Sequence, residues 1–213
     1  MKLYTYYRSS SSYRVRIALN HKGLPFDSIP VHLVKDGGEQ HAQEYLKMNP
    51  RAEVPYLLDE SIGLSQSVSI FFYLDRAYIE KPLFPKAFPE FEKCLELVEI
   101  INSGIQPLQN LSVLQKLKRD FNISDDQKEA WCRHFIDKGL KAFDQKVSED
   151  GSYSMGDEVS SADMFLIPQL YSAKRFGLDL GAYKNLKRID EACAKLEAFQ
   201  KAHPDQQVDF PKK

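Results

Sequence analysis

The chain has 213 residues, of which 43% are hydrophobic and 28% are charged, and its formal net charge is −1 at pH 7. A chain of this length and composition can bury a substantial core in one large or two small domains. The balanced charge excludes a whole-molecule attraction to nucleic acid or to an anionic membrane, so we expect any anion recognition to be local, in a pocket for a small molecule.

No stretch of the sequence is apolar for long enough to form a signal peptide or a membrane span, which indicates a cytoplasmic protein. The three cysteines, Cys94, Cys132 and Cys193, are widely spaced, and each lies among helix-forming residues. This pattern favours buried free thiols over a disulfide framework or a metal site.

The first part of the chain predicts strand, helix and strand in turn. Residues 3–6 have the aromatic and β-branched composition of a strand, and helical periodicity follows until Gly23 supplies a stop. Residues 29–33 alternate in hydropathy and predict a second strand, which a helical crossover makes parallel to the first. Because Pro30 cannot donate a backbone hydrogen bond, we expect this strand at an edge of the sheet.

The next elements complete a small sheet. Residues 39–47 predict a short helix that Asn49-Pro50 ends. Residues 54–58 and 62–64 are so close in the sequence that they require an antiparallel hairpin, and Gln66-Ser67 opens another helix. The order βαβ followed by αββα predicts an α/β, thioredoxin-like domain over residues 1–80.

The rest of the chain predicts an all-α domain. Residues 81–89 hold three prolines and serve as the linker, and helical periodicity dominates residues 90–213. Ser160 and Asp163 have the spacing of a capping box at the start of a buried helix. An apolar stripe from Leu186 to Phe199 predicts one last long helix, and we expect a loose tail over residues 206–213.

The junction between the first strand and the first helix predicts an anion site. Residues 8–16 place four serines and three arginines there. The first N–H groups of a helix lack intrahelical partners and carry partial positive charge, so a thiolate, carboxylate or phosphate is stabilised beside them. The alternative is structural, with one serine as the helix cap and the others in a polar loop.

The residues of this junction resemble a known signature. The run Arg8-Ser-Ser-Ser-Ser-Tyr-Arg-Val-Arg-Ile-Ala-Leu is similar to that of zeta-class glutathione transferases, which usually reads Ser-Ser-Cys-Ser, an aromatic residue and Arg-Val-Arg-Ile-Ala-Leu. The resemblance continues over nearly the whole chain, through residues 36–40, 49–50, 54–55, 66–67, 105–114, 156–159 and 162–163.

The resemblance implies a fold and an activity. The fold is a thioredoxin-like domain followed by a helical bundle, with a cis peptide between Val54 and Pro55. The activity is glutathione-dependent cis–trans isomerisation of maleylacetoacetate to fumarylacetoacetate, in tyrosine and phenylalanine breakdown. Glutathione is then the cofactor, the partner is a small substrate with carboxylates, and a homodimer is expected.

The resemblance also assigns residues. Ser9 faces the glutathione sulfur, Arg8 and Arg175 bind substrate carboxylates, and the catalytic set is Arg8, Ser9 and Ser11. Backbone and polar groups that bind glutathione come from both predicted domains: Ser9, Ser10, Ser11, Ser12, Tyr13, Arg14, Gln40, Val54, Gln66, Ser67, Gln106, Asn110, Leu111 and Ser112.

One position departs from the family pattern and keeps other functions open. Ser11 stands where the family has its cysteine, and a serine is a far weaker nucleophile. The alternatives are a maleylpyruvate isomerase, a general zeta-class transferase or dehalogenase of α-halo acids, and a protein of this fold that only binds partners. Ser9, Val54, Gln66 and Ser67 argue against the last alternative because the glutathione-binding residues are kept.

Overall fold

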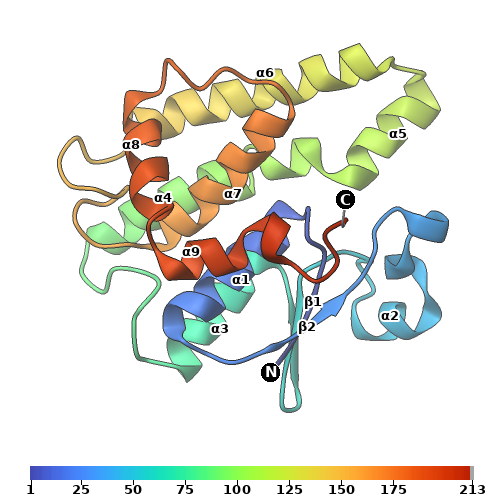
Figure 1. Cartoon of the computed structure of the whole chain (residues 1–213), viewed down its shortest axis with the longest axis horizontal. Coiled ribbons are helices and arrows are strands. Elements are labelled where there is room, and N and C mark those ends of the chain that lie inside the picture. The colour runs from blue at the N-terminus through green and yellow to red at the C-terminus, as the bar shows by residue number, and fades with distance from the viewer. Residues whose placement is uncertain (212–213) are drawn as a thin grey trace. The chain divides into compact units, whose positions relative to one another are not determined.

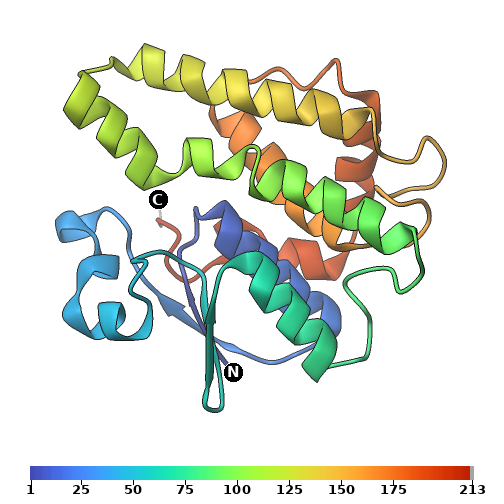
Figure 2. The same cartoon turned by 180° about the vertical axis from the view of Figure 1, so that it is seen from behind.

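The computed structural model describes residues 1–211, and Lys212 and Lys213 lie outside the described part. Two compact units make up the chain (Figures 1 and 2). The first contains Met1–Leu83 together with Ala194–Lys213, and the second contains Phe84–Cys193. The division into domains at residues 1–80 and 90–213 stays a prediction, and the compact units add that the last segment of the chain belongs with the first.

The first unit is built on a four-stranded sheet with the order β2-β1-β3-β4. Strand β1 (Lys2–Thr5) pairs in parallel with β2 (Asp27–Pro30) and antiparallel with β3 (Tyr56–Asp59). Strand β4 (Ile62–Ser65) closes an antiparallel hairpin with β3. The parallel pair, the hairpin and the edge position of Pro30 are therefore confirmed, although β2 ends at Pro30 instead of running to residue 33.

Helices cover both faces of this sheet, and Figures 1 and 2 show α1 (Ser10–Lys22) and α3 (Ser67–Ala77) on one face and α2 (Gln43–Met48) on the other. Tyr4, Tyr6 and Tyr56 pack with Tyr45 of α2, whereas the alternate residues of the same strands face the other way, as the two-residue period of a strand requires. The expected helix over residues 39–47 is divided, with short 3-10 turns at Lys35–Gly37 and Glu39–His41 before α2.

The second unit is all-helical among the described residues. Its elements are α4 (Glu90–Asn102), a 3-10 turn at Gln106–Gln109, α5 (Leu111–Phe121), α6 (Asp125–Asp144), α7 (Ser161–Arg175) and α8 (Lys184–Cys193). Helix α7 is buried along most of its length and packs against α4. Its expected capping box is confirmed, because the Asp163 carboxylate accepts a hydrogen bond from the N–H of the N-cap residue Ser160 (2.9 Å). The same carboxylate also accepts from the N–H of Ser154 (2.8 Å).

The three cysteines are free and buried, as expected. Burial raises the pKa of the Cys94 and Cys193 thiols and raises that of Cys132 to about 11. None of these thiols is therefore a good candidate for a reactive nucleophile at neutral pH. Each described helix is too short or too polar to cross a lipid bilayer.

The end of the chain differs from the sequence-based expectation in two ways. The single last helix is wrong, because α8 ends at Cys193 and α9 (Glu197–Ala202) begins after a break. The loose tail is wrong over residues 206–210. A 3-10 turn (Pro204–Gln206) follows α9, and Asp209 accepts a hydrogen bond from the N–H of Tyr7. The residues that α9 and the tail contact are distant in sequence, so local pattern did not reveal these contacts.

Candidate functional site

Ser9 is the N-cap of α1, and its position sets the geometry of the predicted anion site. Its backbone is extended (φ −71°, ψ 117°), and its Oγ accepts a hydrogen bond of 3.2 Å from the N–H of Ser12. No hydrogen bond within residues 1–211 uses the N–H groups of Ser10 and Ser11. Two backbone donors and the Ser9 hydroxyl hydrogen thus remain for an anion at the start of α1.

Cations lie on both sides of these donors. Arg8 is half-buried and forms no ion pair among the described residues, and its guanidinium lies 6.0 Å from the centre of the Tyr6 ring. Arg14 is almost fully buried and donates from Nη1 to Ser67 Oγ over 3.1 Å. This hydrogen bond joins the second turn of α1 to the first residue of α3, so the two predicted binding segments are held together.

Tyr6 stays neutral beside this site. Its burial raises the pKa of its hydroxyl to about 12, although the Arg8 guanidinium opposes that shift. The ring therefore adds no negative charge near the start of α1 at physiological pH. Ser12 and Tyr13 are also buried, and the Tyr13 ring lies against His203 and under the Arg16 guanidinium.

The loop before β3 offers a backbone edge. The Val54–Pro55 peptide is cis, as the resemblance implied. Val54 is 8% exposed, and its backbone N–H and C=O form no hydrogen bond within the described part of the chain. The preceding residue is fixed, because Tyr45 Oη (2.6 Å) and Asn49 Nδ2 (2.7 Å) both donate to the carbonyl of Glu53. This rigid, unpaired backbone can pair with a peptide ligand.

Gln66 precedes α3 in an unusual backbone conformation. Its φ is +70° and its ψ is 116°, a combination that L-residues rarely adopt. Its side chain is exposed and has no partner among residues 1–211, whereas Ser67 is buried against Arg14. An exposed amide without a partner next to the first N–H groups of α3 is an arrangement that can bind a carboxylate.

The side chain of Gln40 packs closely against Gly38. Its Nε2 donates to the carbonyl of Leu33 over 3.2 Å, and its Oε1 is buried without a partner in the described residues. A Cβ atom on Gly38 would lie 2.4 Å from Gln40 Nε2, so a larger residue would displace this amide, and the φ of +102° at Gly38 also favours glycine. The family resemblance predicted a binding role for Gln40 and assigned no role to Gly38.

The remaining predicted residues lie in the second unit. Gln106 belongs to the 3-10 turn before α5, and Asn110 is the N-cap of α5. Asn110 Oδ1 accepts hydrogen bonds from both the N–H and the Oγ of Ser112, at 3.1 Å each, so a capping role explains this pair. Leu111 is half-buried, and Arg175, in the last turn of α7, is exposed with its guanidinium 4.7 Å from the centre of the Phe176 ring.

Arg16 is the organising residue that sequence reasoning missed. It is fully buried, and its guanidinium donates to Thr5 Oγ1 and to the carbonyls of Tyr6, Tyr7 and Ala202. It thereby holds the loop between β1 and Ser9. A charged residue between Val15 and Ile17 in an apolar run was the available signal, because a buried arginine requires several partners.

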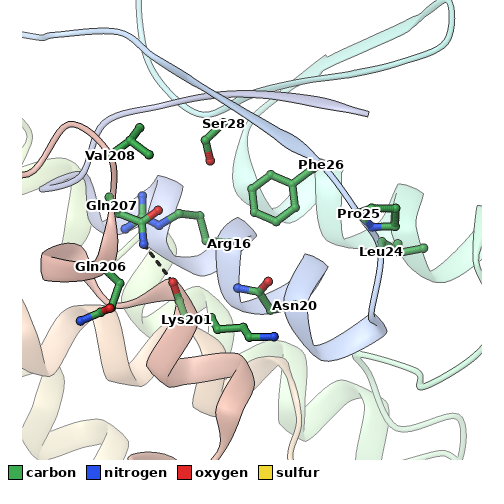
Figure 3. Close-up of a pocket in the computed structure, with 10 residues that line it drawn as sticks. All are labelled: Arg16, Asn20, Leu24, Pro25, Phe26, Ser28, Lys201, Gln206, Gln207 and Val208. Atoms are coloured by element: carbon green, nitrogen blue, oxygen red, sulfur yellow. Dashed lines mark hydrogen bonds between the residues drawn. The ribbon is translucent and has the colours of Figure 1, made fainter.

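A cavity of about 390 Å³ lies on another side of Arg16 (Figure 3). It is bounded by α1, by residues 24–28 and by the C-terminal segment, and none of its lining residues belongs to the predicted glutathione set. Its lining residues include Asn20, Phe26 and Gln207. It is therefore distinct from the donors at the start of α1.

Comparison with known proteins identifies the family of this chain. The sequence model for the glutathione S-transferase N-terminal domain matches residues 3–82. The chain is 44% identical over 210 residues to a probable maleylacetoacetate isomerase 2 of Drosophila melanogaster, across 98% of this chain and 90% of that protein.

Two solved structures are similar over nearly the full length. The holo structure of a maleylpyruvate isomerase, a bacterial glutathione S-transferase of the zeta class, has a TM-score of 0.96 and 36% identity, covering 99% of this chain and 100% of the other. A maleylacetoacetate isomerase of Methylobacterium extorquens AM1, with malonate and glutathione bound, has a TM-score of 0.94 and 32% identity, with 100% of both chains covered. The protein belongs to the zeta class of glutathione S-transferases, the family that includes the maleylacetoacetate isomerases.

Proposed function

We propose that this protein is a glutathione-dependent isomerase that converts maleylacetoacetate to fumarylacetoacetate in tyrosine and phenylalanine breakdown. The observation that carries the proposal is the set of unpaired donors at the start of α1, next to the unpaired cation of Arg8. Relatives at about this level of identity bear the name maleylacetoacetate isomerase, including one of Pseudomonas aeruginosa at 42%.

The residues of the first unit fit glutathione. The tripeptide has a backbone, two carboxylates and a thiol, and each needs a different partner. The unpaired N–H and C=O of Val54 suit the cysteinyl backbone, and the strained Gln66 with the N–H groups that open α3 suits the γ-glutamyl carboxylate. Gln40 would reach the glycyl end, where its buried Oε1 lacks a partner in the described residues.

The chemistry follows from the donors around Ser9. Bound glutathione supplies a thiolate that adds reversibly to the cis double bond, so that rotation becomes possible before the bond is restored. The Ser9 hydroxyl donates a hydrogen bond to the sulfur, while its Oγ still accepts from the Ser12 N–H. The N–H groups of Ser10 and Ser11 and the charge of Arg8 favour the anionic form of the thiol, which lowers its pKa.

Arginines would bind the substrate's carboxylates. Arg8 is our candidate in the first unit, because its guanidinium has no carboxylate partner among the described residues. Arg175 of the second unit is the second candidate, and Gln106, Asn110, Leu111 and Ser112 would line the pocket. The bound malonate in the Methylobacterium extorquens relative is a small dicarboxylate, which supports a substrate of this class.

One observation favours a second substrate. Ser11 replaces the cysteine of the family signature, at the second residue of α1. A reaction that needs a protein thiol is therefore excluded at this position, and isomerisation of maleylpyruvate is our second candidate. The maleylpyruvate isomerase structure with a TM-score of 0.96 supports this alternative.

The test is a panel of substrates with a matched pair of variants. The purified protein is assayed with glutathione and maleylacetoacetate, maleylpyruvate or dichloroacetate. Ser9→Ala should lower kcat on the preferred substrate by about a hundredfold, the typical effect of losing one such donor. Ser124→Ala is the control, because Ser124 caps α6 through a hydrogen bond of the same 3.2 Å length and lies outside the proposed site. Full activity of Ser9→Ala on every substrate would exclude Ser9 as the thiolate partner.

We further propose that the protein is a cytoplasmic homodimer, as the family resemblance implies. Light scattering coupled to size exclusion should give twice the chain mass of 24.5 kDa. A mass of one chain at micromolar concentration would contradict the dimer and leave the assignment of the glutathione site unaffected.

A further inference from the structure

The loop from Tyr6 to Ser9 is hydrogen-bonded to the C-terminal segment. On its carbonyl side, Arg16 donates to Tyr6 O (3.3 Å) and Tyr7 O (3.1 Å), and the N–H of Ser9 donates to Tyr6 O (3.0 Å). On its amide side, the N–H of Tyr7 donates to Oδ2 of Asp209 over 2.9 Å, although 202 residues separate the two in sequence. Figure 1 shows the C-terminal segment beside the start of α1.

A second contact joins the same two segments. The Phe210 ring meets the Tyr7 ring edge to face, with 5.4 Å between the centroids and an interplanar angle of 88°. Such aromatic pairs contribute beyond the area that they bury. We call residues 208–210 the C-terminal strap. Its hydrogen bond through Asp209 and its ring contact through Phe210 are both made with Tyr7, two residues before Ser9.

Hydrogen bonds of Gln207, the residue before the strap, hold the strap to α9. The side-chain amide of Gln207 donates to the carbonyls of His203 (2.8 Å) and Lys201 (3.0 Å), and the N–H of Phe210 donates to the carbonyl of Gln207 (3.0 Å). Figure 3 shows the Gln207 bond to Lys201 at the edge of the cavity. Val208 lines that cavity and is 73% exposed, so packing holds this side of the strap only weakly. Asp209 and Phe210 therefore carry the attachment to the loop.

We propose that Asp209 and Phe210 are positioning residues for the catalytic loop, which act through Tyr7 to hold the Ser9 hydroxyl and the Arg8 guanidinium in place. Oδ1 of Asp209 is buried and has no hydrogen-bond partner within residues 1–211. A half-buried carboxylate that leaves one buried oxygen without a partner adds little to the stability of the fold, so stability alone is a poor reason to keep it there. The hydrogen bond that Asp209 Oδ2 accepts from the Tyr7 N–H explains why the carboxylate lies there. This inference rests on the proposed glutathione site.

Two substitutions at Asp209 separate its hydrogen bond from its charge. Asp209→Asn removes the charge and keeps an oxygen that can accept from the Tyr7 N–H, whereas Asp209→Ala removes both. We expect Asp209→Ala to lower kcat about tenfold relative to Asp209→Asn, because small misplacements of catalytic groups are costly. The pKa of bound glutathione, read from the ultraviolet absorbance of its thiolate, should be higher in Asp209→Ala than in Asp209→Asn.

A readout on the free protein tests the mechanism directly. Hydrogen exchange at the Tyr7 amide should be slow in the wild type and in Asp209→Asn and fast in Asp209→Ala. Asp205→Ala is the matched control, because Asp205 lies in the same tail, is exposed and bonds to His203. We expect its Tyr7 exchange and its kcat to equal those of the wild type.

The outcomes decide the proposal in each case. Equal kcat, thiolate pKa and Tyr7 exchange in Asp209→Ala and Asp209→Asn would overturn it. Should Asp209→Ala fail to fold, Phe210→Leu serves instead, with Tyr7 exchange faster than in the wild type as the expected result and unchanged exchange as the contrary one. Absence of turnover with every substrate in the wild type would contradict the proposed reaction alone, because exchange and thiolate absorbance need no isomerase substrate.

Discussion

The Ser9 hydroxyl group can accept one hydrogen bond and still donate another. Its oxygen accepts from the Ser12 N–H, which satisfies one of the orphan donors of α1. Its hydrogen remains available to a ligand, as do the N–H groups of Ser10 and Ser11, which form no hydrogen bond within residues 1–211. A capping serine at this position is therefore compatible with a catalytic one, and the structural reading of the serine run does not exclude the functional reading.

The first residue-scale prediction concerns Ser11→Cys. The introduced thiol would lie in the first turn of α1 near Arg8, where the partial charge of the helix and the cation favour a thiolate. We expect its pKa to fall below the ordinary value of about 8.5. The rate of alkylation by iodoacetamide as a function of pH measures it.

The native cysteines provide the background for this measurement. All three are buried, and burial raises each pKa, to about 11 for Cys132. The wild type should therefore react slowly at every pH up to neutrality. An introduced thiol that titrates at or above its ordinary value would show that the start of α1 does not stabilise an anion.

The second residue-scale prediction concerns Gln66→Gly. Glycine adopts a φ of +70° without the steric cost that Gln66 bears, so the free energy of unfolding should rise by up to about 1 kcal/mol. Glutathione affinity should fall, because the exposed amide is lost. Urea unfolding and calorimetry measure the two quantities.

Ala52→Gly is the matched control for Gln66→Gly. Ala52 also has a positive φ, of +54°, and no predicted role with glutathione. It should gain stability without losing affinity. Equal glutathione affinities in the two variants would mean that the strain at Gln66 serves the fold and not the ligand.

The residues at the start of the first helix indicated where an anion site could lie, the family resemblance assigned the other site residues, and those assignments stay predictions. The serine run and its arginines predicted an anion site because a helix start with several hydroxyl and guanidinium groups can stabilise an anion, although a cap and a polar loop would also explain the serines. Arg16 was missed as an organiser because its partner Ala202 lies 186 residues away in sequence, and only the folded chain brings the two together. Gly38 is only two residues from Gln40, but its close approach to that side chain depends on the loop conformation, which no local pattern encodes. No local pattern encodes the φ of Gln66.

At the scale of elements, hydrophobic periodicity predicted an element correctly wherever a single unit buries all of its apolar residues. The hairpin, the parallel pair and the buried helix α7 were all predicted, because turn length and apolar spacing determine them locally. The single helix predicted from the apolar residues between Leu186 and Phe199 is wrong, because the two halves of this segment pack in different units. Leu186 and Ile189 are buried in the second unit, and Phe199 is buried in the first, so the helix breaks between them.

The element-scale prediction compares two capping boxes. In α7, the Asp163 carboxylate is fully buried and accepts from the N–H groups of Ser154 and Ser160. Asp163→Asn would turn an NH₂ group toward one of these buried donors, so the free energy of unfolding should fall by about 2–3 kcal/mol. Urea unfolding followed by circular dichroism measures this loss.

The exposed box of α6 is the control. Gln127 Oε1 accepts from the Ser124 N–H over 2.9 Å, and both side chains lie in solvent. Gln127→Ala should therefore cost no more than about 1 kcal/mol. Similar losses of unfolding free energy in Asp163→Asn and Gln127→Ala would mean that burial does not determine how much a capping box stabilises the protein.

At the scale of the whole molecule, the last segment of the chain completes the first unit. Helix α9 packs against α1, and the carbonyl of Ala202 accepts a hydrogen bond of 3.0 Å from Nε of the fully buried Arg16. A chain that folds in sequence order therefore leaves Arg16 without one of its partners until its last residues arrive. The first unit depends on residues from both ends of the sequence.

This dependence predicts different effects for two truncations. A chain that ends at Cys193 loses α9, and an incompletely paired buried guanidinium should cost at least about 3 kcal/mol of unfolding free energy. A chain that ends at Gln207 keeps α9 and the Gln207 contacts with Lys201 and His203, so it should unfold at nearly the urea concentration of the full chain. It lacks the strap, and its Tyr7 amide should exchange quickly. If the chain that ends at Cys193 were as stable as the full chain, the role of Arg16 in joining both ends of the sequence would be wrong.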